Sequence, residues 1–137
     1  MEKTLFDQVK VGDITLKNRF VRSATWEGMC DDSGAVTEQL LDWYKELAEG
    51  GTGLIISGYS FVRADGKQLK GKMGIHSDAM IEGLKRLSAF VQQAGSLIFC
   101  QLVHAGGQTS SKVVGSQPIA PSAIDFASFD ETPREMT

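Results

Sequence analysis

Small and polar residues follow each of three apolar stretches of the sequence. Ser23-Ala24-Thr25 follows the first stretch, Ser57-Gly58-Tyr59 the second, and Gln101 and His104 the third. On a (β/α) barrel, chemistry is carried out at the carboxyl ends of the strands. Gln101 carries both a donor and an acceptor, so it could bind a ligand there. The alternative is structural, with the hydroxyls bonding local backbone in turns and Gln101 a satisfied polar group.

Other kinds of active site find little support in the sequence. His76 and His104 have no cysteine, serine or carboxylate at a catalytic spacing, and we expect His104 to anchor a loop by a hydrogen bond. Cys30 and Cys100 lie far apart, without a CxxC or Cys/His pattern, so neither a metal site nor a disulfide framework is expected. Free cysteines of this kind fit a reducing cytoplasm.

Composition describes a globular chain without a nucleic-acid or membrane partner. The 137 residues are 42% hydrophobic and 23% charged, and the net charge is −3. No basic patch is available to neutralise a phosphate backbone. The apolar runs are far shorter than the roughly 20 residues that span a bilayer, and no secretory signal opens the chain. Lys67, Lys70 and Lys72 are interpreted as solvated loop charges.

Strand-like and helix-like patterns alternate along the chain. Thr37 is a good N-cap for a helix that ends at Gly50-Gly51, and Tyr44 belongs to its apolar stripe. Ser77 or Asp78 caps a second helix, which Gly95 closes. The predicted order is a hairpin at 5–16, a strand at 20–25, a helix from 37, a strand at 54–58, a helix from 77, a strand at 97–103 and a loop at 104–137.

This alternation predicts parallel strands joined by right-handed crossovers. Both an open doubly wound sheet and part of a (β/α)₈ TIM barrel would fit. The sequence lacks GxGxxG and GxxxxGK[ST] motifs, and the polar strand ends favour the barrel. We therefore interpret residues 1–137 as the N-terminal part of one barrel domain, with a hairpin cap at 1–18 and a long loop after the third strand at 104–137.

A complete barrel needs eight strands and about 250 residues, whereas three strands and two helices are predicted here. We expect the chain to be a fragment of a longer natural protein, or to be stabilised by another chain.

Four segments carry a resemblance to a known family. They lie in order over essentially the whole chain, and they are Leu16-Lys17-Asn18-Arg19-Phe20, Gly53-Leu54-Ile55-Ile56, Gln101-Leu102-Val103-His104-Ala105-Gly106 and Ala120-Pro121-Ser122-Ala123-Ile124. Together they resemble the old yellow enzyme family of NAD(P)H:flavin oxidoreductases. The resemblance implies an FMN at the mouth of the barrel, reduced by NADH or NADPH and reoxidised by a small electron-poor acceptor such as an activated alkene.

The resemblance also implies which residues bind the cofactor. The end of the first strand would run beside the flavin ring, the backbone near Tyr59 would approach it, and the Gln101 amide would reach its pyrimidine. Relatives carry Thr, Cys or His where this chain has Trp26, so its substrate preference should differ from that of members with Thr or Cys there. The implied cofactor-binding residues are Ser23, Ala24, Thr25, Trp26, Tyr59 and Gln101. The family's proton-donating Tyr and its His/Asn pair would lie beyond Thr137, so no catalytic residue is assigned.

Two further interpretations remain open at this point. One is a barrel-derived structural or association module without flavin chemistry. The other is part of an aldolase or lyase barrel, which would need a Schiff-base lysine on a strand, and no predicted strand contains one. A homo-oligomer, the nicotinamide preference and the physiological oxidant are also left open.

Overall fold

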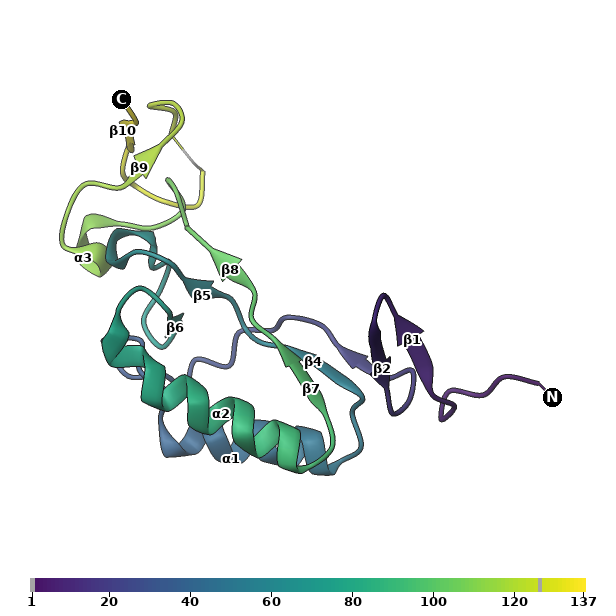
Figure 1. The fold of residues 1–137 in the computed structure, drawn as a ribbon. Helices are drawn as coiled ribbons and strands as arrows, with labels where there is room; N and C mark the ends of the chain where they lie inside the picture. Colours follow the sequence, from purple (N-terminus) through teal and green to yellow (C-terminus); the bar gives the residue numbers. More distant parts are fainter. Residues whose placement is uncertain (1, 126) are drawn as a thin grey trace.

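The computed structural model describes residues 2–125 and 127–137 and consists of short strands packed against two helices (Figure 1). The helices and strands follow in the order β1 (Val9–Val11), β2 (Ile14–Leu16), β3 (Val21–Arg22), α1 (Glu38–Glu49), β4 (Leu54–Ile56), β5 (Ser60–Phe61), β6 (Met73–Gly74), α2 (Ile81–Gln93), β7 (Leu97–Phe99), β8 (Leu102–Val103), α3 (Ser111–Val114), β9 (Ile119–Ala120) and β10 (Arg134–Glu135). Within this described part, no helix is long and apolar enough to cross a membrane.

The centre of the structure is a parallel sheet in the order β3-β4-β7. Leu54 of β4 pairs with Val21 on one side and with Leu97 on the other. The chain then continues into a second parallel sheet, in the order β6-β5-β8. This arrangement of parallel strands joined through helices is the predicted (β/α) barrel architecture, present in part and not closed.

The second and third predicted strands are each interrupted near their carboxyl ends. The predicted stretch 54–58 ends at Ile56 and resumes as β5, while 97–103 breaks between β7 and β8. At the breaks, the Ser57 backbone N–H donates to Phe99 O at 2.8 Å, and the Gln101 N–H donates to Ser57 Oγ at 3.3 Å. A side-chain oxygen therefore replaces a backbone carbonyl at this point, which keeps the strands together while the regular pairing stops.

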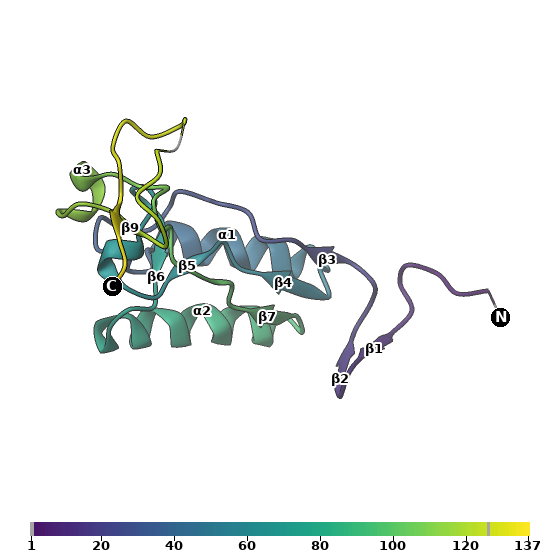
Figure 2. The ribbon, with the colours of Figure 1, turned by 90° about the horizontal axis from the view of Figure 1, so that it is seen from above.

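Both predicted helices form, and they lie side by side along the sheet (Figure 2). Thr37 caps α1 as expected, because its Oγ1 accepts the Leu40 N–H at 3.2 Å. The start of α2 differs from the prediction. A 3₁₀ turn at Asp78–Met80 precedes the helix, and Ser77 caps that turn without a side-chain hydrogen bond. The buried faces of both helices meet Ile55 of the sheet in the core cluster, formed by Leu40, Leu41, Tyr44, Ala48, Ile55, Met73, Leu87 and Val91.

The predicted hairpin forms from β1 and β2, and it stands at one end of the molecule (Figure 1). The residues that follow it join both helices to the sheet. Lys17 Nζ donates to Ala48 O at 3.4 Å and to Ala94 O at 3.1 Å, which are carbonyls at the ends of α1 and α2. Asn18 Nδ2 donates to Gly51 O at 2.6 Å. A cation near two helix carboxyl ends is electrostatically favourable, which gives a physical reason for a lysine at position 17. The Asn18 amide satisfies a further carbonyl just beyond the end of α1.

Residues 104–137, predicted to be a loop without regular structure, contain three short elements. Helix α3 has four residues, and β9 and β10 form a parallel pair with Ile119 opposite Arg134. Thr109 is fully buried, and its hydroxyl donates to Lys67 O at 2.7 Å. Elements of two to four residues are too short to produce a hydrophobic period, so a sequence pattern could not reveal them.

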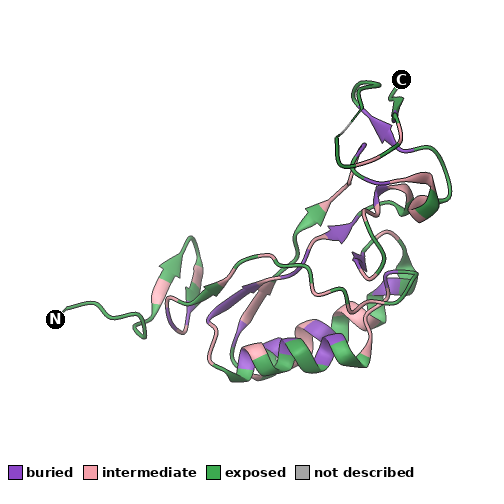
Figure 3. Ribbon diagram, turned by 180° about the vertical axis from the view of Figure 1, so that it is seen from behind, coloured by how far each residue is buried: buried purple, intermediate pink, exposed green. Residues whose placement is uncertain are grey.

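Apolar surface remains exposed on both sides of the sheet. Figure 3 shows that the strands contain exposed and half-buried residues beside the buried ones. On the face opposite the helices, Val21 and Phe99 are 51% and 44% exposed, and Leu102 of the second sheet is 61% exposed. On the helix side, an apolar groove of about 420 Å³ runs along α2 and reaches Ile98 and Cys100. In complete (β/α)₈ barrels the first face lines the interior and a further helix covers the second.

Candidate functional site

The carboxyl ends of the three predicted strands meet at one edge of the structure. Gly58 lies directly against the end of the first strand, because a Cβ placed on it would be 2.6 Å from the Thr25 carbonyl oxygen. The Ser60 N–H donates to Gln101 O at 2.7 Å, which joins the second strand to the third. The segments predicted from the strand ends are therefore brought together, at the edge where parallel sheets bind ligands.

The end of the first strand is irregular and carries free backbone donors. Pairing stops at Arg22, which is opposite Ile55. Among the described residues, the backbone N–H groups of Ala24, Thr25 and Trp26 find no hydrogen-bond acceptor. The Thr25 hydroxyl donates to Ser23 O at 3.1 Å, as expected for a turn residue. The segment thus has one hydroxyl bonded locally and, among the described residues, three unpaired backbone amides.

Gln101 is held by its backbone and leaves its side chain free. Its N–H bonds Ser57 and its carbonyl accepts from Ser60, so the position of the residue is set by the second strand. The residue is exposed, and its amide makes no hydrogen bond within the described part of the chain. An exposed amide on a fixed backbone is suited to binding a ligand that offers both a donor and an acceptor.

Trp26 and Tyr59 flank the ammonium group of a buried lysine. Lys72 Nζ lies 4.0 Å from the ring centre of Tyr59 and 4.8 Å from that of Trp26. Lys72 is only 6% exposed, so its interpretation as a solvated loop charge is wrong. Burial lowers the pKa of Lys72, and the nearby Glu27 carboxylate opposes this effect. The aromatic faces stabilise the desolvated cation and explain its burial.

The Tyr59 side chain is fixed in the structure. Its hydroxyl accepts the Gln68 N–H at 3.1 Å and lies 3.2 Å from Gln68 Oε1. Burial raises the pKa of Tyr59 to about 12, so the hydroxyl is protonated at neutral pH and can donate to that oxygen. Tyr59 therefore ties the strand end to the following loop, while the preceding Gly58 contacts the Thr25 backbone.

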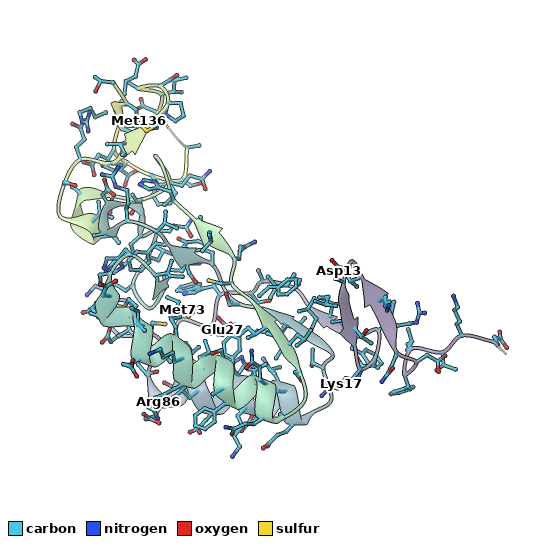
Figure 4. All side chains as sticks on the ribbon, in the orientation of Figure 1. Asp13, Lys17, Glu27, Met73, Arg86 and Met136 are labelled. Carbon is cyan, nitrogen blue, oxygen red and sulfur yellow. The ribbon has the colours of Figure 1, made fainter. Side chains whose placement is uncertain are left out.

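A carboxylate lies behind this edge, between the helices and the strands (Figure 4). The Glu27 side chain is 8% exposed, and its Oε1 lies 3.2 Å from Arg22 Nη2. The same oxygen accepts the Tyr44 hydroxyl at 3.0 Å, and the Tyr44 oxygen accepts the Gly58 N–H at 3.0 Å. Burial and the Glu27 charge raise the pKa of Tyr44, which stays protonated. These bonds join the first strand, α1 and the turn after β4.

His104 anchors a loop, as the sequence predicted. Its Nδ1 accepts the Gly106 N–H at 3.0 Å, and its Nε2 faces Asp65 Oδ1 at 3.4 Å. The ring packs on Gly66, where a Cβ would be 2.7 Å from His104 Cδ2. In the described part of the chain, no group of three or more His, Cys, Asp or Glu residues could hold a metal ion.

Sequence reasoning missed the residues that support the strand ends from behind. The sequence alone indicates no role for Glu27, places Tyr44 in an apolar stripe and predicts Lys72 in a solvated loop. The sequence does contain one indication of this support: Tyr44 places a hydroxyl in an apolar helical stripe, and a buried tyrosine hydroxyl needs a hydrogen-bond partner. The identity of that partner depends on contacts between residues 17 and 14 positions apart in the chain.

Comparison with known proteins agrees with the geometry. The family model for the NADH:flavin oxidoreductase / NADH oxidase family matches residues 4–137. An NADPH dehydrogenase from Geobacillus sp. (strain WCH70) is 38% identical over 138 residues, covering 100% of this chain and 40% of that protein. An NADH oxidase from Thermoanaerobacter brockii is 33% identical over 137 residues, covering 97% of this chain and 21% of that protein.

Solved structures give the same result. The old yellow enzyme homologue from Zymomonas mobilis superimposes with a TM-score of 0.88 at 31% identity, covering 98% of this chain and 40% of that one. Morphinone reductase in complex with tetrahydroNAD superimposes with a TM-score of 0.87 at 26% identity, covering 99% and 41%. The chain thus spans about 40% of these structures. It belongs to the NADH:flavin oxidoreductase / NADH oxidase family, whose solved relatives include the old yellow enzymes.

Proposed function

We propose that this chain supplies the flavin-ring side of an FMN site in an NAD(P)H-dependent oxidoreductase. The observation that carries the proposal is the set of free backbone N–H groups at Ala24, Thr25 and Trp26 at the same edge as the free Gln101 amide. The polar edge of a flavin ring presents hydrogen-bond donors and acceptors, and these groups would pair with it.

The residues present fit an FMN ring. The Ser23–Trp26 backbone and the Tyr59 neighbourhood would lie along the ring, and Gln101 would bond its pyrimidine. Gly58 has no side chain, so the turn after β4 can pack directly against Thr25 and Glu27, and this close packing holds the two backbone segments together beside the proposed ring site. When bound, FMN supplies the hydride chemistry, while the protein positions the ring and tunes its electrostatics.

We propose NADH or NADPH as the electron donor and a small electron-poor molecule, such as an activated alkene, as the acceptor. The names of relatives support the donor, since two are an NADPH dehydrogenase and an NADH oxidase, and a solved relative binds tetrahydroNAD. The indole of Trp26 is half exposed at the strand end, which supports the proposal that it would contact the acceptor. Two free thiols, at Cys30 and Cys100, fit a cytoplasmic protein.

The experiment uses the protein expressed from its complete coding sequence. We expect it to be purified yellow, to bleach anaerobically with NADH or NADPH, and to regain colour with an α,β-unsaturated ketone. A colourless protein that takes up no FMN would refute the proposal and favour the non-catalytic barrel module.

A matched pair of variants tests the binding role of the glutamine. Gln101→Leu removes the free amide and should weaken FMN binding about threefold to tenfold, as expected for one lost hydrogen bond. Gln92→Leu makes the same change on the exposed face of α2 and should leave binding unchanged. Fluorescence titration with FMN measures both dissociation constants, and equal values for the two variants would contradict the assignment.

A further inference from the structure

We propose that Glu27 is a positioning residue for the flavin: through the Tyr44 hydroxyl it fixes the Gly58 backbone against the Thr25 segment. This inference rests on the function proposed above. Glu27 and Tyr44 lie behind the strand ends, so they act through the backbone and need not touch the ring. The role is distinct from that of Gln101, whose amide would contact the cofactor directly.

The direction of the hydrogen bonds requires an acceptor oxygen at position 27. The Gly58 N–H donates to the Tyr44 oxygen at 3.0 Å, which uses that oxygen as an acceptor. The tyrosine proton must then point elsewhere, and Glu27 Oε1 receives it at 3.0 Å. Tyr44 is 1% exposed, so water does not replace either partner. Without Glu27 a buried hydroxyl loses its acceptor, and without the hydroxyl a buried backbone N–H does.

Close packing makes this support rigid. A Cβ on Gly58 would be 2.5 Å from Glu27 Oε2 and 2.6 Å from the Thr25 carbonyl oxygen. The turn after β4 therefore has the Glu27 side chain and the Thr25 backbone as its immediate neighbours. A shift of the Glu27 side chain would therefore move Gly58 relative to the Thr25 segment, because Gly58 packs against both of them.

The charge of Glu27 also contributes to the electrostatics of the site. Arg22 forms an ion pair with it at 3.2 Å, and the buried Lys72 cation is near enough for its pKa to respond to the carboxylate. Glu27→Gln would leave two cations less compensated behind the ring. Reduced flavin carries more negative charge than oxidised flavin, so this change should raise the reduction potential of bound FMN.

Three substitutions in the complete protein separate these effects. Tyr44→Phe keeps the ring volume and removes the hydroxyl, and Glu27→Ala removes the carboxylate. Both should weaken FMN binding about threefold to tenfold, because Gly58 loses the contact that holds it in position beside the ring, at a cost of about one hydrogen bond. Glu27→Gln keeps an acceptor oxygen for Tyr44, so unlike Glu27→Ala it should bind FMN with near wild-type affinity. It removes the charge, so it should raise the reduction potential of bound FMN.

The control is Glu38→Gln, which makes the same change in an exposed pair with Arg86. It should alter neither the FMN dissociation constant nor the potential. Wild-type affinity in both Tyr44→Phe and Glu27→Ala would overturn the proposal, and so would a Glu27→Gln protein with an unchanged potential. A wild-type protein that binds no FMN would overturn the proposed function as well, which distinguishes the two failures. Circular dichroism of each variant checks that the fold is retained.

Discussion

Replacing Gly58 by alanine should separate the two backbone segments at the strand ends. The new Cβ would be 2.5 Å from Glu27 Oε2 and 2.6 Å from Thr25 O, whereas ordinary contact begins at 3.4 Å. An overlap of this size cannot be relieved by rotating a free side chain. Glu27 is held by Arg22 and Tyr44, and the other obstacle is backbone.

The expected cost follows from this overlap. Inserting one methyl group into a well-packed site costs about 1–3 kcal/mol of unfolding free energy. The strand ends should also move apart, so FMN binding should weaken together with stability. Urea unfolding of the FMN-free protein measures the first effect, and FMN titration measures the second.

Gly50→Ala is the matched control at the end of α1. Gly50 has a φ of −66°, and the nearest atom to its Cβ is the Glu46 carbonyl oxygen of the preceding turn at 3.1 Å. At such a site the restriction of the unfolded chain by alanine offsets the contact with that carbonyl, so the free energy of unfolding should change by less than about 1 kcal/mol. If Gly58→Ala unfolds at the same urea concentration as Gly50→Ala and binds FMN as well, the packing argument is incorrect.

Two further predictions concern the supporting structure. Lys17→Met keeps the aliphatic stem but loses the hydrogen bonds to the last carbonyls of both helices, which should cost about 1–2 kcal/mol in urea unfolding. Lys45→Met, which breaks a surface pair with Glu49, should cost less than about 1 kcal/mol, and equal losses would argue against the capping role. Burial, reinforced by nearby acidic groups, raises the pKa of Cys30 to about 12, so at pH 8 its thiol is protonated and unreactive. Mass spectrometry should find Cys30 alkylated by iodoacetamide only after unfolding, and rapid labelling of the native protein would contradict this.

Local sequence patterns determined most of the architecture. Thr37 and the glycines after residue 49 define α1, and the run Leu54-Ile55-Ile56 defines the central strand. These features depend on neighbours within about four residues, so a single sequence contains them. The family resemblance also lies in short contiguous segments. The polar groups at the strand ends, including Gln101, adjoin the apolar runs in the sequence, so the sequence indicates them as well. The structure then places those strand ends at one edge.

Tertiary structure alone decided how that edge is supported. Lys72 reads as one of several loop lysines until two aromatic rings, 46 and 13 positions away, enclose it. Glu27 has no recognisable role until the crossover through α1 brings Tyr44 and Gly58 to it. The interruptions in the two strands depend likewise on a hydroxyl of one strand bonding an amide of the next. Burial and hydrogen-bond partners of polar side chains are set by contacts distant in sequence, and such contacts leave no periodic pattern in the residues that make them.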